Sequence, residues 1–258
     1  MELDVAIPGW TNGTNILELD VPPELERTIA SGIRWFDHVV GGEGLTPSTS
    51  AMVTGDAGTG KTTMLLQLAD AYMSRGHHVI FNTNEENLYQ VRKVTRRLRF
   101  RSGFHACQFN LAGELIAYAR SLQKKYENKK AKDGNPVQVI VVQDSLQTLD
   151  DGKYSGGTTS RTPYHCIRML TEWCKDSFGI SIVIGQVDKA GNMLGPNKLK
   201  HAIDMHVHLG YDLCKKSETF GERFLYVRKN RFGSTGAEVH MAMSSQGLCA
   251  ADELPYMS

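Results

Sequence analysis

Nine consecutive residues in the first third of the chain limit the possible folds more than any other part of the sequence. They read Gly55-Asp56-Ala57-Gly58-Thr59-Gly60-Lys61-Thr62-Thr63, which matches the pattern G-x-x-x-x-G-K-[ST]. Glycines in such a loop let a run of backbone N–H groups curl around a polyphosphate. Lys61 then supplies positive charge to the β- and γ-phosphates, and the hydroxyl of Thr62 is placed to bind Mg²⁺. The segment therefore predicts a P-loop that binds ATP and Mg²⁺.

The sequence on either side of this loop agrees with that interpretation. Residues 49–54 are short, apolar and partly β-branched, as expected of a buried strand. After the loop, apolar residues recur at helical spacing, namely Met64, Leu65, Leu68, Ala69 and Tyr72. A helix that starts there points its N-terminus at the phosphates. The alternative, a glycine-rich turn that only resembles the pattern, is disfavoured because strand, loop and helix occur in the required order.

The rest of the chain alternates between predicted strands and predicted helices. Strands are expected at residues 78–83, 105–111, 137–144 and 180–186, and helices at residues 87–100, 112–126 and 164–178. Three later segments, residues 205–210, 222–229 and 237–243, alternate apolar and polar side chains and indicate closing strands that are partly antiparallel. Together these features predict an α/β fold with a mostly parallel, doubly wound sheet and antiparallel C-terminal strands.

The sequence divides into one large domain with a short segment on each side. Residues 1–27 are rich in Pro, Gly and Asn and lack periodicity, which predicts an extended arm or linker. Residues 28–248 form the predicted ATPase domain, and residues 249–258 a short tail. The five cysteines include no C-x-x-C pair, so we expect no zinc site, no disulfide framework and a reducing, cytoplasmic location. We also expect no contact with a membrane, because no segment resembles a signal peptide or a membrane span.

The basic residues are concentrated in the middle of the chain. The whole chain has 29 Lys and Arg against 28 Asp and Glu, a formal net charge of +1. All 29 basic residues lie between Arg27 and Arg231, where there are only 19 acidic residues, so this part carries a net charge of +10. Such an asymmetry is expected of a core that faces a polyanion. For any single basic run, a solvated helix face is the simpler explanation.

Polar residues at the ends of predicted strands supply the remaining catalytic candidates. Asp144 ends the apolar segment at residues 137–144, as a carboxylate that holds the Mg²⁺ water shell does. Glu85 ends the strand that follows the P-loop helix and is the candidate for orienting the attacking water. Glu86 is the second candidate, although an acidic residue there also suits the start of the next helix. Gln186 ends a later strand next to a glycine-rich loop and is a candidate sensor of the γ-phosphate.

Several segments, in order along the chain, resemble one known family. They are Ser31-Gly32-Ile33 with Phe36-Asp37 and Gly41-Gly42, the P-loop, Glu85-Glu86, Asp144-Ser145-Leu146-Gln147-Thr148, residues 191–204, and Lys229-Asn230-Arg231-Phe232-Gly233-Ser234-Thr235. Over roughly residues 28–248 the chain resembles the ATPase core of the bacterial RadA (Sms) recombination proteins, which belong to the RecA/DnaB superfamily. The resemblance implies a RecA-like P-loop NTPase core. We expect neither the four-cysteine zinc element nor the Lon-like domain of that family in this sequence, and Gln186 stands where the family commonly has His.

The resemblance assigns a role to Lys229 and Arg231. The two residues are two apart, so on a strand they project from one face. The resemblance implies that they reach a nucleotide bound by the neighbouring subunit and act as fingers in trans. Without the resemblance, two exposed basic residues at the end of a strand would be the simpler interpretation.

The resemblance also implies that two glycine-rich loops, residues 150–163 and 187–200, line a central channel and bind single-stranded DNA. The candidates for neutralising DNA phosphates there are Lys153, Arg161, Lys189, Lys198 and Lys200. Tyr154 is a candidate for stacking on a base, although a loop tyrosine is more often plain surface. Tyr89 and Arg92 are candidates for contact with adenine, with ordinary helix-surface positions as the alternative.

The sequence therefore predicts a DNA-dependent ATPase of recombination and repair, similar to RadA, that acts as a translocase or branch-migration helicase. It is expected to bind single-stranded DNA as a ring or short helical homo-oligomer, with a hexamer as the expected form. Three alternatives stay open: a filament-forming RecA-type strand-exchange recombinase, a KaiC-like regulatory ATPase that binds proteins and not DNA, and a degenerate nucleotide-binding adaptor. The presence of Lys61, Glu85 and Asp144 disfavours the last.

Overall fold

A computed structural model describes residues 13–154, 157–186 and 198–253 of the chain. The strands are β1 (Ser50–Thr54), β2 (His78–Thr83), β3 (His105–Cys107), β4 (Val139–Asp144), β5 (Ile180–Ile184), β6 (Met205–Tyr211), β7 (Arg223–Asn230), β8 (Glu238–Ser244) and β9 (Gly247–Ala250). The α-helices are α1 (Arg34–Val39), α2 (Lys61–Ser74), α3 (Leu88–Arg97), α4 (Ala112–Tyr126), α5 (Thr162–Ser177) and α6 (Lys198–Ala202).

These strands form a single sheet in the order β3-β2-β4-β5-β1-β6-β7-β8-β9. Neighbouring strands from β3 to β6 are parallel, and those from β6 to β9 are antiparallel. The carboxyl ends of β1, β2, β4 and β5 therefore meet along one side of the sheet, which we call the carboxyl edge, and the opposite side is the amino edge. The predicted fold class, a mostly parallel doubly wound sheet with antiparallel C-terminal strands, is confirmed.

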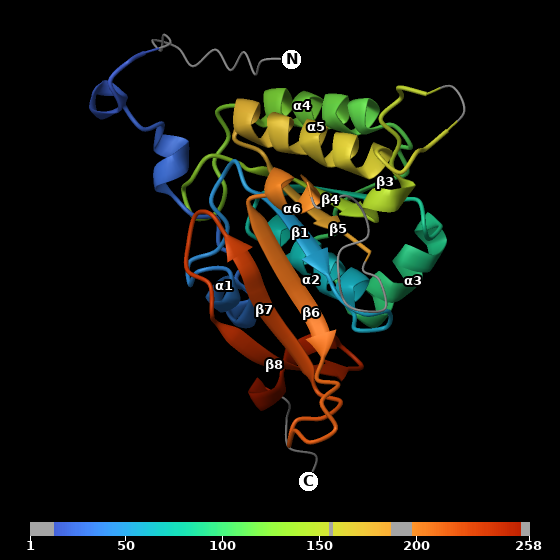
Figure 1. The fold of residues 1–258 in the computed structure, drawn as a ribbon. Helices are drawn as coiled ribbons and strands as arrows, with labels where there is room; N and C mark the ends of the chain where they lie inside the picture. Colours follow the sequence, from blue (N-terminus) through green and yellow to red (C-terminus); the bar gives the residue numbers. More distant parts are fainter. Residues whose placement is uncertain (1–12, 155–156, 187–197, 254–258) are drawn as a thin grey trace.

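Helices cover both faces of the parallel part of the sheet (Figure 1). On one face, α1, α2 and α3 pack on the strands through a core that includes Phe36, Leu65, Leu68 and Val91. On the other face, α4 and α5 lie side by side over β1, β2, β4 and β5, and Leu115, Ile167 and Trp173 belong to their core. Because the strands are buried on both faces, they read as continuous apolar runs in the sequence.

On the α6 side of the sheet, the part of β6 that continues past α6 carries polar side chains. His206 and His208 of β6 point to this face, and the hydroxyl of Thr54 lies 2.7 Å from Nε2 of His206 and 3.0 Å from Nδ1 of His208. Burial lowers the pKa of both imidazoles to about 4. Both are therefore neutral at pH 7, and a neutral imidazole nitrogen can accept the hydrogen bond of the Thr54 hydroxyl.

Several segments differ from the sequence prediction, most by a few residues at their ends, and three of the differences affect the sheet or the loops. A short helix, α6, occupies part of the predicted loop at residues 187–200, and a final strand, β9, carries the sheet to Ala250, beyond the predicted boundary at residue 248. The strand predicted at residues 105–111 ends at Cys107. It ends early because the side chain of Asn82 accepts a hydrogen bond from the N–H of Phe109 (2.7 Å) and donates one to its carbonyl (2.9 Å), so a side chain satisfies backbone groups that a strand would have paired.

In the described part of the chain, the helices are too short or too polar to cross a membrane.

Candidate functional site

The P-loop joins β1 to α2 at the carboxyl edge of the sheet. The backbone φ angles of Gly55, Gly58 and Gly60 are +148°, +78° and +108°, values that residues with a Cβ rarely adopt. At Gly55 a Cβ would also collide with the backbone carbonyl of Leu209 on β6. Gly60 precedes the first residue of α2, a helix of 14 residues, so the free N–H groups and the positive end of the helix dipole face the loop. The loop therefore has the conformation that a phosphate cradle requires, and phosphate binding by it stays a prediction.

Lys61 lies across the mouth of this loop. Its Nζ donates to the carbonyl oxygens of Gly55 (2.9 Å) and Asp56 (2.7 Å). Burial lowers the pKa of this ammonium, while Asp144, Asp56 and Glu85 act in the opposite direction. The charge is therefore already held at the place where the β- and γ-phosphates of a nucleotide would bind.

Asp144 lies next to Thr62, as expected for an Mg²⁺ site. The hydroxyl of Thr62 donates to Oδ2 of Asp144 over 2.7 Å, which joins the end of β4 to the first turn of α2. The pKa of Asp144 is raised to about 6, chiefly by burial and also by the neighbouring charges of Glu85 and Glu86, although the Thr62 hydrogen bond and Lys61 act in the opposite direction. Hard oxygen donors beside a desolvated carboxylate suit Mg²⁺, which would also relieve the repulsion among the three carboxylates.

Glu85 is brought to the same place from the end of β2. Its carboxylate is exposed and accepts a hydrogen bond from the hydroxyl of Ser145, the residue after Asp144. Glu86 is half-buried and also acts on Asp144 electrostatically. Sequence reasoning missed Ser145, although it directly follows the strand-ending carboxylate. Its hydroxyl is placed to orient the Glu85 carboxylate.

A pair of amides braces the two strands that carry these carboxylates. The Nδ2 of Asn82 on β2 donates to Oε1 of Gln143 on β4 over 2.7 Å, and both side chains are fully buried. Gln143 also donates to the carbonyl of Ser145 (2.8 Å). Because the pair is satisfied, it fixes the strand ends, and therefore Glu85 and Asp144, relative to each other. One signal in the sequence was available, since each amide interrupts an otherwise apolar strand.

Gln186 and Tyr211 lie near the same edge. Gln186 is exposed and lies two residues after the end of β5. The residue between them, Gly185, donates its N–H to the carbonyl of Val53 on β1 (2.9 Å). The hydrogen bond places Gln186 beside the P-loop strand, and its role as a sensor stays a prediction.

Tyr211, at the end of β6, was not predicted as a site residue. Its hydroxyl donates to the carbonyl of Gly58 over 3.2 Å, and the guanidinium of Arg223 lies 5.0 Å from the centre of its ring. Tyr211 therefore supports the tip of the P-loop.

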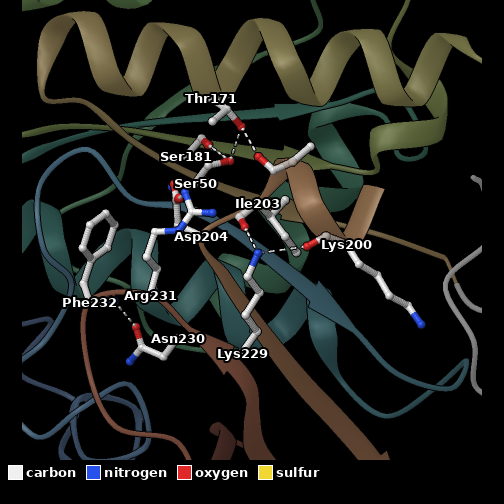
Figure 2. Close-up of polar contacts among 11 residues, drawn as sticks. Ser50, Thr171, Ser181, Lys200, Ile203, Asp204, Lys229, Asn230, Arg231 and Phe232 are labelled. Carbon is white, nitrogen blue, oxygen red and sulfur yellow. Dashed lines mark hydrogen bonds and ion pairs between the residues drawn. The ribbon is translucent and has the colours of Figure 1, made fainter. Parts of the chain in front are cut away.

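Lys229 and Arg231 are at the amino edge, at the opposite end of the sheet from the P-loop of their own chain. Met205 pairs with Ala51 at the start of β1 and with Asn230 at the end of β7. Both basic side chains point toward α6 (Figure 2). Nζ of Lys229 donates to the carbonyl oxygens of Lys200 (3.0 Å) and Ile203 (2.5 Å), and burial lowers its pKa.

Arg231 pairs with a buried carboxylate and remains half exposed. Its Nη1 lies 2.7 Å from Oδ1 of Asp204, and 49% of the Arg231 side chain is exposed against 1% for Asp204. Asn230, between the two basic residues, donates to the carbonyl of Val40 at the end of α1 (3.0 Å). Arg231 thus presents charge at the surface, whereas the ammonium of Lys229 is engaged within its own subunit.

The predicted DNA-binding residues are only partly described. Lys153, Arg161 and Lys200 are exposed, the first two on the loop before α5 and the third on α6. Lys198 is the first residue of α6, its side chain is outside the description, and Lys189 lies outside the described residues. Tyr89 and Arg92, the adenine candidates, are exposed on α3. DNA binding by these lysines and arginines stays a prediction.

Comparisons with known proteins agree with this geometry. A family model described as "ATPase: KaiC" matches residues 29–247. "DNA repair protein RadA" of Brucella abortus is 30% identical over 222 residues, which cover 85% of this chain and 44% of that protein. The RadA protein of Escherichia coli is 30% identical over 227 residues, with coverages of 87% and 45%. The chain thus spans about half the length of the curated relatives it matches.

Solved structures share the fold at lower identity. One solved ATPase domain superposes with a TM-score of 0.72 at 14% identity and covers 88% of this chain and 93% of that domain. KaiC-like protein PH0186 of Pyrococcus horikoshii superposes with a TM-score of 0.65 at 17% identity, with coverages of 87% and 98%. The predicted resemblance to the RadA-type P-loop ATPase core is confirmed by these comparisons.

Proposed function

Because the chain belongs to the KaiC ATPase family, we propose that it couples ATP hydrolysis to movement on single-stranded DNA during recombination and repair. Family membership makes it a P-loop ATPase. The DNA-related part of the proposal is supported by the relatives named "DNA repair protein RadA". Since the chain spans about half of those proteins, the activity of the whole relative is carried over here as a proposal.

One observation carries the mechanism: the candidate catalytic groups are divided between the two edges of the sheet. Lys61, Thr62, Asp144 and Glu85 converge at the carboxyl edge. Arg231 is half exposed at the amino edge, where it cannot reach the phosphates held by its own P-loop. A head-to-tail assembly would place the amino edge of one subunit against the carboxyl edge of the next. A ring or short helical homo-oligomer, with a hexamer as the proposed form, would complete each site in this way.

Within such a site, each residue has a defined task. The P-loop N–H groups and Lys61 would bind the triphosphate, and Thr62 and Asp144 would hold Mg²⁺, which neutralises charge on the phosphate oxygens. Glu85, oriented by Ser145, would accept a hydrogen bond from the attacking water and place it in line with the γ-phosphate. Gln186 would sense the γ-phosphate. Arg231 of the neighbouring subunit would stabilise the charge that develops in the transition state. Lys229, predicted as a second finger, donates to carbonyls of its own subunit and would support α6 beside Arg231.

The DNA part of the proposal depends on charge. The segment from Arg27 to Arg231 carries a net charge of +10, and Lys153, Arg161 and Lys200 are exposed on it. Binding through such residues releases counterions, so the affinity for single-stranded DNA should fall steeply with salt concentration.

The test measures ATP hydrolysis with and without single-stranded DNA in the wild type, in Arg231→Ala, in Lys61→Ala and in an equal mixture of the two variants. Each variant alone should be inactive. In the mixture, about a quarter of the interfaces pair an intact P-loop with an intact Arg231, so activity should return toward that fraction. Hydrolysis by Arg231→Ala at the wild-type rate, or a mixture that stays inactive, would refute the arrangement in trans.

A regulatory ATPase that binds proteins and not DNA is the second candidate, favoured by the description of the matching family model. It predicts no stimulation of turnover by DNA and no salt-dependent retention on single-stranded DNA. A filament-forming recombinase is distinguished from a ring by negative-stain microscopy in the presence of nucleotide and DNA.

A further inference from the structure

Asp204 is the most constrained carboxylate of the described residues at the amino edge. It lies between α6 and β6 and is 1% exposed. Its Oδ2 accepts the N–H of Ser50 at the start of β1 (3.2 Å), and its own N–H donates to the carbonyl of Ser50 (2.9 Å). Main chain and side chain together therefore fix Asp204 to the central strand of the sheet.

Hydroxyl groups from α5 and β5 hold this corner in place (Figure 2). The hydroxyl of Thr171 donates to the carbonyl of Ala202 (3.0 Å) and lies 3.0 Å from Oγ of Ser50, and Oγ of Ser181 lies 3.2 Å from the same Ser50 oxygen, so the three hydroxyls share hydrogen bonds. Lys229 ties the end of α6 to β7 from the other side. A buried polar network with satisfied partners is rigid, so the carboxylate has little freedom to move.

Arg231 is bound to this carboxylate at two points. Its Nη1 pairs with Oδ1 of Asp204, and its backbone N–H donates to the carbonyl oxygen of Asp204 (3.0 Å). Half of the side chain remains exposed, so the guanidinium keeps N–H groups that can bind a second anion. A planar fork with five donors can bind a carboxylate and a phosphate at once, which a lysine ammonium does poorly.

We propose that Asp204 is the positioning residue for Arg231: it fixes the guanidinium at the amino edge in the orientation needed to meet the triphosphate of the next subunit. This inference rests on the proposed function, because it requires Arg231 to act across the interface. An arginine free at the end of a strand would lose much rotational freedom on docking, whereas an arginine already held by a buried carboxylate loses less. Asp204 therefore acts on the reaction through Arg231 and contacts no substrate itself.

Asp204→Asn tests the proposal, because it keeps the size of the side chain and one acceptor for Ser50 while it removes the charge. Nucleotide affinity at its own P-loop should be unchanged, and kcat should fall by about 10- to 100-fold, the range expected when a reacting group is misplaced by about an ångström. Glu172→Gln is the matched control. It removes a carboxylate that is also paired with an arginine, Arg168, on the same face, and kcat should stay at the wild-type value.

Mixing with Lys61→Ala separates positioning from a general effect on folding. The Asp204→Asn subunit keeps its P-loop, and the Lys61→Ala subunit offers a correctly held Arg231, so an equal mixture should recover activity as the Arg231→Ala mixture does. Activity of Asp204→Asn at or above the wild-type rate would overturn the proposal, since a carboxylate that only sequesters Arg231 gives that result. A defect that Lys61→Ala does not rescue would overturn it as well, because the fault then lies in the variant's own fold or P-loop.

Arg231→Lys supplies a second test that leaves Asp204 intact. A single ammonium cannot bind Asp204 and a phosphate in the geometry of a fork, so kcat should fall nearly as far as in Arg231→Ala. Activity close to wild type would overturn the proposal. The mixture of Arg231→Ala with Lys61→Ala tests the proposed function separately. If this mixture regains ATP hydrolysis while the Asp204→Asn and Arg231→Lys predictions fail, only the positioning role of Asp204 is refuted. If the mixture does not regain hydrolysis, the action of Arg231 in trans is refuted as well.

Discussion

The P-loop contains two glycines whose replacement by alanine should have very different costs. Both have positive φ, +148° at Gly55 and +78° at Gly58. At Gly58 nothing lies within 4 Å of the added Cβ, so only backbone strain remains, about 1–2 kcal/mol. At Gly55 the Cβ would lie 2.7 Å from the carbonyl carbon of Leu209 and would overlap its oxygen. This overlap can be relieved only if β1 and β6, which are hydrogen-bonded to each other, move apart. Strain and overpacking together give about 2–6 kcal/mol.

Urea unfolding without nucleotide measures both costs. The free energy of unfolding should fall by about 1–2 kcal/mol in Gly58→Ala and by about 2–6 kcal/mol in Gly55→Ala, with unchanged m-values. Gly55→Ala should also lose ATP binding under conditions where it is still folded, because the movement of β6 carries Tyr211, which supports Gly58, with it. Equal costs for the two variants, or a larger cost at Gly58, would refute the argument that the contact with Leu209 fixes the start of the loop.

Three further outcomes are expected. Ser145→Ala should lower kcat about tenfold with little change in KM, because Glu85 loses the hydrogen bond that orients it; steady-state kinetics check this. Lys229→Met should lower the free energy of unfolding by about 1–3 kcal/mol in urea, because the carbonyls of Lys200 and Ile203 lose their donor, whereas the exposed Lys216→Met should not. Burial lowers the pKa of His77 from 6.5 to about 4, so the contribution of the neutral imidazole to stability is fully present above pH 6.5 and is lost as the pH falls toward 4. At pH 5 the free energy of unfolding should therefore be about 2 kcal/mol lower than at pH 7.5. In urea unfolding, His77→Gln should show a smaller difference between these two pH values.

Local patterns were enough to predict the parts of the fold that depend on local physics. β2 and α4 begin and end at the predicted residues, 78–83 and 112–126. An apolar run between glycines identifies a buried strand, and apolar residues at helical spacing identify a helix, whatever the remainder of the chain does. The P-loop belongs to the same class, because its glycines, lysine and hydroxyl are adjacent in sequence. Asp144 and Glu85 were predictable because parallel strands bring their carboxyl ends to one edge.

Contacts between distant residues were not predictable in this way. Asn82 and Gln143 are 61 residues apart, and Tyr211 and Gly58 are 153 apart. β9 is fixed by Gln67, 181 residues away, whose amide exchanges two hydrogen bonds with Leu248. A single sequence carries no signal for such pairs beyond a polar residue in an apolar segment. The Asp204–Arg231 pair is of the same kind, and it depends on a strand order that places β6 between β1 and β7.

The orientation of Lys229 and Arg231 shows how one irregularity decides a functional face. Strict alternation along β7 would place both on the same face as Val227, which is buried in the core under α1 and α2. Instead, Val227 pairs with Val207 and Lys229 with His206, so Arg228 is an extra residue, a β-bulge. The bulge turns the end of β7 over, and Lys229 and Arg231 reach α6 and Asp204 on the other face. Their spacing predicts that they share a face, and the bulge determines which one. Because that face is also at the amino edge, the proposed role of Arg231 requires a P-loop from another subunit.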